Sequence, residues 1–211
     1  MAGLKRAGAL ALALVAVPLP GPPPATAKVT VASGSLRAVV NEDPWRLVLR
    51  DANGKAVLSE SLTPSNCPAG PLGLRTATGW AHATRAVSVR RDGADVVATL
   101  ATTDPGRRID VRIAPAGPGA IALTASAPGA EATGMGFDAL AGERFLGFGS
   151  RSNAVDQRGK EVENYVADGP YREEDRNYTR ASVPPWATRD RDDATYFPVP
   201  WMLSSRGYGT R

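Results

Sequence analysis

Apolar and polar residues alternate with a period of two through most of the chain between residues 28 and 137. In the stretch PWRLVLRD, for example, Trp45, Leu47 and Leu49 would point to one face of a strand and the residues between them to the other. This pattern is typical of a strand that is buried on one side, whereas an amphipathic helix repeats every 3.6 residues. Beyond an apolar run near the start, no segment predicts an amphipathic helix, so the sequence predicts an all-β fold.

Turn signals separate these runs at spacings of about 8–12 residues. Asn53-Gly54 and Asp92-Gly93 each stand between two runs rich in β-forming residues, which is a strong hairpin signal. Two further runs each place three apolar residues on one face, namely Ile109, Val111 and Ile113, and Ile121, Leu123 and Ala125. Many short strands with regular turns predict an antiparallel β-sandwich.

The first 27 residues have the features of an export signal. Lys5 and Arg6 form a short basic start, and residues 7–17 are an apolar run interrupted by one glycine. That run is shorter than the roughly 20 residues that a membrane-spanning helix needs, and Ala25-Thr26-Ala27 fits a cleavage site. An amphipathic anchor is the alternative, but the run has no polar face. We therefore interpret residues 1–27 as a removed signal peptide and expect a secreted or periplasmic protein without a membrane span.

The composition argues against several kinds of function. A single cysteine, Cys67, rules out an internal disulfide, and a single histidine, His82, argues against a His-rich metal site or a histidine-activated nucleophile. We interpret His82 as a structural or exposed residue of a strand. The net charge of +4 becomes +2 without Lys5 and Arg6, and no basic stripe indicates a nucleic acid partner. The sequence therefore predicts no metal, no cofactor and no nucleic acid partner.

The stretch ERFLGFGSRSNAVDQRG contains two closely spaced glycines, Gly147 and Gly149. A dinucleotide-binding turn needs a third glycine and a helix after it, and neither is present here. Glycine in a strand allows a bulge or the close approach of another backbone. We therefore predict a strand that the glycines shape, and no phosphate site.

Residues 150–195 are polar and rich in charge. Loops of this length are usually functional or disordered, and the aromatic residues Tyr165, Tyr171 and Trp186 argue against disorder. Acidic clusters occur at 161–163, 173–175 and 190–193. We interpret them as solvated loop residues, because proximity in sequence does not establish a catalytic carboxylate pair. Calcium binding at 190–193 is a weaker alternative, because the EF-hand pattern is missing.

The end of the sequence returns to a strand pattern. The stretch TYFPVPWMLSSRGYGT predicts a strand, a turn at Arg206-Gly207 and the start of another strand. Aromatic rings can line a sugar pocket or belong to the core. For Tyr196, Phe197 and Trp201 we predict a place in the core.

Two stretches together resemble one family. ERFLGFGSRSNAVDQRG resembles the E-R-x-x-G-x-G strand and D-x-R-G turn of glycoside hydrolase family 31, the α-glucosidase and α-xylosidase family. The matching residues are Glu143, Arg144, Gly147, Gly149, Asp156, Arg158 and Gly159. TYFPVPWMLSSRGYGT resembles the aromatic-proline strand and R-G-Y-G turn of the same family, here residues 206–209. The strand-rich part before them is similar in pattern to the family's N-terminal galactose-mutarotase-like sandwich.

The resemblance implies a function for the complete protein. The family hydrolyses α-glycosides with retention, using two aspartates on a (β/α)8 barrel that follows the sandwich. It implies that residues 28–211 are the N-terminal β-sandwich domain, truncated before the barrel, with no catalytic residue and with a substrate-facing loop at 150–195. The family's W-N-x-D sequence corresponds to Tyr165-Val166-Ala167-Asp168, so Asp168 is expected to bind the sugar. The alternative is a turn residue before Gly169-Pro170.

The expected partners are thus an α-linked carbohydrate and a catalytic barrel. The alternative function is a stand-alone carbohydrate-binding module without catalytic activity. An aldose epimerase is disfavoured, because that chemistry uses a histidine and an acid in the pocket and His82 has no second histidine beside it.

Overall fold

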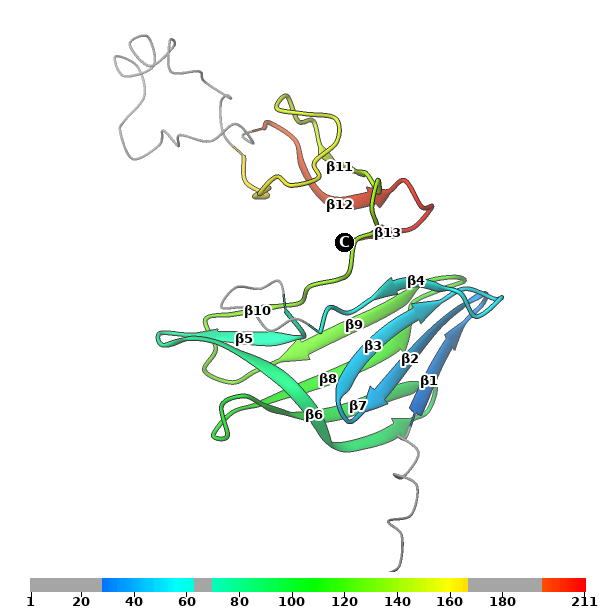
Figure 1. Ribbon diagram of the computed structural model, residues 1–211, viewed down its shortest axis with the longest axis vertical. Coiled ribbons are helices and arrows are strands. Elements are labelled where there is room, and N and C mark those ends of the chain that lie inside the picture. The colour runs from blue at the N-terminus through cyan, green and yellow to red at the C-terminus, as the bar shows by residue number, and fades with distance from the viewer. Residues whose placement is uncertain (1–27, 63–69, 167–194) are drawn as a thin grey trace, which may run out of the picture.

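The computed structural model describes residues 28–62, 70–166 and 195–211 (Figure 1). These residues contain strands and turns but no helix, and all the sheets are antiparallel. This confirms the predicted all-β class and the antiparallel β-sandwich. In the same ranges, no helix that could span a membrane is found. The proposed signal peptide, residues 1–27, lies outside the described residues.

The first layer is a four-stranded meander in which each strand pairs with the next along the chain. Its strands are β1 (Lys28–Ser33), β2 (Leu36–Glu42), β3 (Trp45–Arg50) and β4 (Ala56–Ser59). The hairpin predicted at Asn53-Gly54 joins β3 to β4, but its connection spans residues 51–55. The Asp51 carboxylate holds this turn by accepting the N–H groups of Asn53 and Lys55, each at 2.9 Å.

The second layer is a six-stranded sheet in the order β10-β5-β6-β7-β8-β9. The bounds are β5 (Gly73–Thr76), β6 (Gly79–Asp92), β7 (Asp95–Thr102), β8 (Arg108–Pro115), β9 (Ile121–Ser126) and β10 (Ala132–Gly134). The predicted turn at Asp92-Gly93 joins β6 to β7. Because Asp92 pairs with Asp95, only Gly93 and Ala94 form the loop.

The core lies between these two sheets, which face each other in Figure 1. The predicted alternation holds there, because Trp45 and Leu47 of the first layer are buried against Ile109, Val111 and Ile113 of the second. Each of these side chains is at most 3 % exposed. Burial of one such side chain stabilises a fold by about 1.5–3 kcal/mol, so this core holds the sandwich together.

A third sheet stands apart from the sandwich (Figure 1). Its strands are β11 (Phe145–Gly149), β12 (Pro198–Ser204) and β13 (Gly209–Thr210), in the order β11-β12-β13. The predicted strand, turn and second strand at the end of the sequence are therefore confirmed. The buried core cluster of the sandwich includes none of their residues, so the third sheet needs other contacts to hold it.

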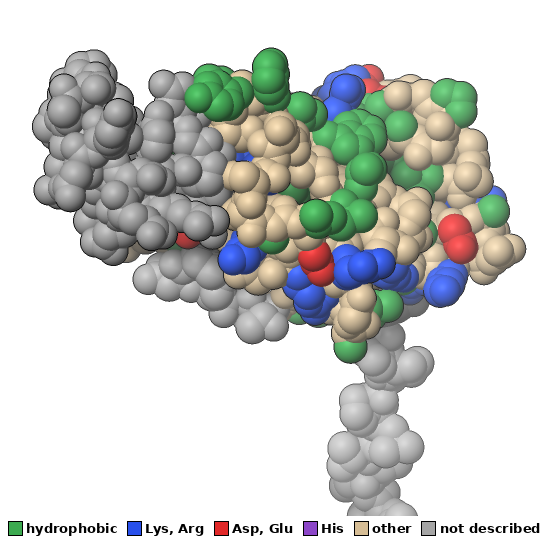
Figure 2. Space-filling model, turned by 90° about the horizontal axis from the view of Figure 1, so that it is seen from above, with side chains coloured by type: hydrophobic (Ala, Val, Ile, Leu, Met, Phe, Trp, Pro, Cys, Tyr) green, Lys and Arg blue, Asp and Glu red, His purple; other side chains and the backbone are tan. Residues whose placement is uncertain are grey.

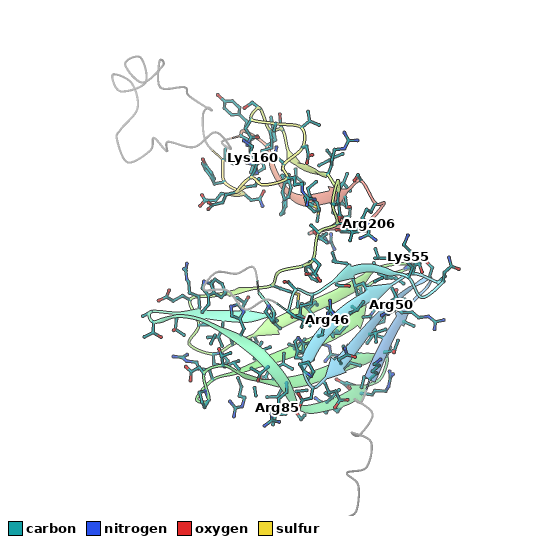
Figure 3. The ribbon with its side chains drawn as sticks, in the orientation of Figure 1. Arg46, Arg50, Lys55, Arg85, Lys160 and Arg206 are labelled. Carbon is teal, nitrogen blue, oxygen red and sulfur yellow. The ribbon has the colours of Figure 1, made fainter. Side chains whose placement is uncertain are left out.

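Backbone contacts along β4 provide that attachment. The segment after β10 runs beside β4, where Phe137 bridges Glu60 and the N–H of Asp138 donates to Ser59 O at 2.9 Å. Arg206, in the turn between β12 and β13, donates to Val57 O at 2.9 Å and to the carbonyl of the preceding residue at 3.2 Å. Figure 3 shows the Arg206 side chain at the end of the third sheet that lies nearest the sandwich.

The prediction that Tyr196, Phe197 and Trp201 belong to the core is wrong. Their exposed fractions are 58 %, 72 % and 43 %. Tyr196 and Phe197 precede β12, and Trp201 lies on the face of β12 opposite to Met202, which lines a pocket. Strand alternation therefore turns Trp201 away from the pocket, and its ring lies beside Gly209. Figure 2 shows hydrophobic side chains gathered on the face of the molecule seen from above.

Prolines protect the edge of β12 beyond its pairing with β13. Ser204 donates its N–H toward β13. Backbone groups alternate in direction along a strand, so the backbone nitrogens of Met202, Pro200 and Pro198 face the same edge of β12. Only Met202 of these three pairs with β13. The two prolines have no N–H to offer, which is a common way to stop another strand from adding to a sheet.

Candidate functional site

The Gly147-Phe148-Gly149 stretch of β11 lies opposite a bulge in β12, because Gly147 pairs with Met202 and Gly149 with Pro198. All three residues have positive φ, at 100°, 64° and 91°, and the pairing with β12 shifts between the two glycines. A Cβ atom on Gly147 would collide with Trp201 O, and one on Gly149 would collide with Phe197 O. Of the two predicted reasons for the glycines, the close backbone approach is therefore confirmed, and the bulge lies in the facing strand.

Asp156 anchors the turn that follows this strand. Its Oδ1 accepts the N–H of Phe145 and the N–H of Arg158, each at 3.0 Å. These two hydrogen bonds lower the pKa of Asp156 below its ordinary value of 3.8, and the bond from Phe145 has the larger effect. The aspartate of the D-x-R-G turn thus fixes where β11 begins.

Arg158 braces the same region from the other side. Its guanidinium donates to Leu140 O at 3.0 Å and to Glu143 O at 2.7 Å. The guanidinium carbon also lies 5.8 Å from the centre of the Phe145 ring, within the range of a cation–π contact. Both charged residues of the turn therefore have structural partners.

Glu143 joins the two family-like stretches to each other. Its carboxylate is buried, and Oε1 accepts the hydroxyl groups of Ser204 at 2.5 Å and Tyr208 at 2.6 Å, while Oε2 accepts the N–H of Leu140 at 3.0 Å. The glutamate of the first stretch therefore holds the tyrosine of the R-G-Y-G turn. The two stretches form one structural unit.

The charge on Glu143 is stabilised by this arrangement. Burial alone would raise the pKa of Glu143, but the hydrogen bonds from Ser204, Tyr208 and Leu140, with the nearby charge of Arg206, lower it below its ordinary value of 4.5. Burial and the bond to Glu143 raise the pKa of Tyr208 to about 12. At neutral pH the pair is therefore an ionised carboxylate that accepts from a neutral phenol.

Arg151 ties the bulge to the loop after it. Its Nε donates to Phe148 O at 2.8 Å, and Nη2 donates to Glu163 O at 2.9 Å and to Asn164 Oδ1 at 3.1 Å. A little further on, Val166 forms a parallel bridge with Thr195. The chain therefore leaves at residue 166 and returns at residue 195 from the same place, beside the bulge.

The predicted sugar-binding residue lies between residues 166 and 195 in the sequence. Asp168 falls in 167–194, outside the described residues, as do Tyr171, Trp186 and the acidic clusters at 173–175 and 190–193. Tyr165 and Val166 are described: Val166 pairs with Thr195, and Tyr165 immediately precedes it. Cys67 also lies outside the described residues.

A pocket of about 630 Å³ opens between the third sheet and the β4 edge of the sandwich. Its lining includes Phe137, Asp138, Phe145, Phe148, Lys160 and Tyr208. These residues come from separate segments of the chain, which is why the alternation pattern did not reveal the pocket. The only sequence signal was a bulky aromatic residue, Phe148, between two glycines.

Other residues with chemical potential have structural roles. His82 is buried in β6, where its Nδ1 lies 2.7 Å from Pro71 O and its ring stacks on Trp80. The Glu60 carboxylate is fully buried and accepts the N–H groups of Leu47 at 2.7 Å and Leu72 at 2.6 Å. Across the described part of the chain, no group of three or more His, Cys, Asp or Glu residues could hold a metal ion.

Comparison with known proteins agrees with the resemblance. The family model described as the glycosyl hydrolase 31 N-terminal galactose mutarotase-like domain matches residues 23–210. Searches of curated proteins and of solved structures found no match. The family match covers nearly the whole sequence and includes both of the stretches that Glu143 joins. The chain therefore belongs to the family of glycosyl hydrolase 31 N-terminal galactose mutarotase-like domains.

Proposed function

We propose that this chain is the N-terminal domain of an exported, retaining α-glycoside hydrolase. In this role it packs against a companion (β/α)8 catalytic barrel and forms one wall of the sugar site. The observation that carries the proposal is the structural unit of Glu143 and Tyr208, which joins the two family-like stretches. Export is proposed from the signal-like residues 1–27.

The proposed role is a supporting one, without a catalytic pair. Retaining glycosidases place two carboxylates about 5–5.5 Å apart on either side of the bond. In the described residues, Asp138 is the one carboxylate that lines the pocket, and Arg46 binds it at 3.2 Å. The buried carboxylates of Glu60 and Glu143 accept hydrogen bonds from the chain itself. Each of these groups therefore has a structural explanation, which supports a catalytic centre on the barrel.

Asp168 is proposed to contact the sugar in the complete enzyme. Replacing it with alanine is expected to lower kcat/KM for small α-glycosides about tenfold or more, the effect of roughly 1.4 kcal/mol of lost transition-state stabilisation. The measurement is steady-state kinetics on the protein that includes its barrel.

Asp110→Ala is the matched control, because Asp110 is exposed on β8 and its carboxylate accepts a surface hydrogen bond from the Thr99 hydroxyl at 2.7 Å. Its kcat/KM should equal that of the unmodified enzyme. If Asp168→Ala behaves like this control, Asp168 does not contact the sugar.

A further inference from the structure

The pocket between the third sheet and β4 has the size and walls of a small-molecule site. Its volume of about 630 Å³ lies within the range of about 300–1,000 Å³ that is usual for ligand pockets. Phe137 precedes β11, Phe145 and Phe148 belong to β11, and Tyr208 belongs to the turn before β13. Four aromatic rings from three segments therefore meet around one space.

Phe148 adds an independent sign of function. It is the one non-glycine residue with positive φ in the described ranges, at 64°. A bulky residue rarely adopts this left-handed conformation, which costs a residue with a side chain about 1–2 kcal/mol. Such strain persists where the surroundings impose it, and it clusters at ligand sites. Here the flanking glycines and the bond from Arg151 to Phe148 O impose it beside the pocket.

The polar residues of the pocket match a neutral, hydroxyl-rich ligand. Asp138 and Thr210 offer acceptors, Lys160 offers a donor, and Arg46 holds the Asp138 carboxylate in place at 3.2 Å. The pocket thus carries one positive and one negative side chain among aromatic rings. A sugar ring has apolar C–H faces that pack on aromatic rings and hydroxyl groups that bond to a few polar side chains.

We propose that this pocket binds a single neutral pyranose ring, with an apolar face of the sugar against the Phe148 ring. The site uses only described residues of this chain and is separate from the proposed role of Asp168. The choice of a sugar rests on the proposed function, but the pocket itself does not. Phe148 is the residue that the proposal places in contact with the ligand.

Calorimetric titration of the full chain tests this directly. The probes are methyl α-D-glucopyranoside, methyl α-D-xylopyranoside and maltose, with sorbitol as a polyol that lacks a ring and phenol as an apolar probe. At least one pyranoside should bind saturably, and sorbitol should not. No saturation by any pyranoside, or binding of phenol alone, would overturn the proposal and indicate a seat for an apolar group.

Phe148→Ala should raise the Kd of the bound pyranoside about tenfold or more. Phe197→Ala is the matched control, because Phe197 is 72 % exposed and does not line the pocket, so the Kd of this variant should be unchanged.

Phe148→Gly separates binding from folding. It should melt at a higher temperature than Phe148→Ala, because glycine tolerates positive φ, yet bind as weakly. Retained binding in Phe148→Gly would contradict a contact by the ring.

These measurements use this chain without a catalytic domain, whereas the proposed function is tested by kinetics of the complete enzyme. If no pyranoside binds to this chain, but Asp168→Ala lowers kcat/KM of the complete enzyme, only the pocket proposal is refuted. If a pyranoside binds to this chain, but Asp168→Ala leaves kcat/KM unchanged, only the proposed role of Asp168 is refuted.

Discussion

Gly149→Ala is expected to unfold the third sheet, with a loss of about 3 kcal/mol or more in its local stability. The new Cβ would collide with Phe197 O and would force alanine into φ near 91°. Either β11 must move away from β12 or the bulge must open. Hydrogen exchange should show lost protection of the β11 and β12 amides, while the amides of β6–β8 keep theirs.

Gly54→Ala is the matched control for this result. Gly54 also has positive φ, at 78°, but nothing lies within 4 Å of its Cβ position. Its substitution should cost only the conformational penalty of about 1–2 kcal/mol. Equal losses in the two variants would contradict the close approach of the β11 and β12 backbones.

Glu60→Leu is expected to destabilise the sandwich by about 2–6 kcal/mol. The change leaves the buried N–H groups of Leu47 and Leu72 without an acceptor, at about 1–3 kcal/mol for each. Glu60→Gln keeps one acceptor oxygen, so its cost should be about half as large. Glu131→Leu serves as a control, because Glu131 is half exposed and its ion pair with Arg75 lies on the surface. Chemical denaturation measures all three.

Glu60 also makes stability depend on pH. Burial raises its pKa above the ordinary value of 4.5, against the opposing hydrogen bonds from Leu72 and Leu47. The folded protein therefore keeps this proton at a pH where the unfolded chain has lost it. Its contribution is complete below pH 4.5 and is lost as pH rises through the raised pKa. In Glu60→Gln the stability should no longer fall as pH rises through this range.

Glu143 and Asp156 act in the opposite direction and in a different pH range. Their pKa values are lowered, so their contribution is present above their ordinary values of 4.5 and 3.8 and is lost as pH falls below them. A decline that begins just above pH 4.5 can therefore be assigned to Glu60, because the raised pKa of Tyr208 affects stability only above its ordinary value of 10.0. A decline that persists unchanged in Glu60→Gln would contradict the assignment.

The sandwich could be predicted from the sequence because its signals are local. Ile109, Val111 and Ile113 alternate with charged residues, and Gly93 marks a tight turn, so each strand can be identified within a few residues. The two glycines of β11 could be interpreted in the same way, because only a bulge or a close approach needs them at that spacing.

The third sheet was harder to predict because its contacts connect distant positions. Glu143 bonds to Tyr208, and Arg206 bonds to Val57, across separations that no local pattern encodes. Trp201 was assigned to the core because residues 196–203 are a continuous apolar run, and such a run does not show which face of the strand is covered. The pocket could not be predicted for the same reason, since it forms only when the third sheet meets β4.

We propose that this chain supports a sugar site and holds no reactive pair of its own. The most direct test is release of the aglycone from 4-nitrophenyl α-glucoside and α-xyloside, measured for this chain alone and for the protein that includes the catalytic barrel. We expect no release above the heat-inactivated control from the chain alone and steady turnover from the complete protein. Reproducible cleavage by the chain alone would contradict the claim.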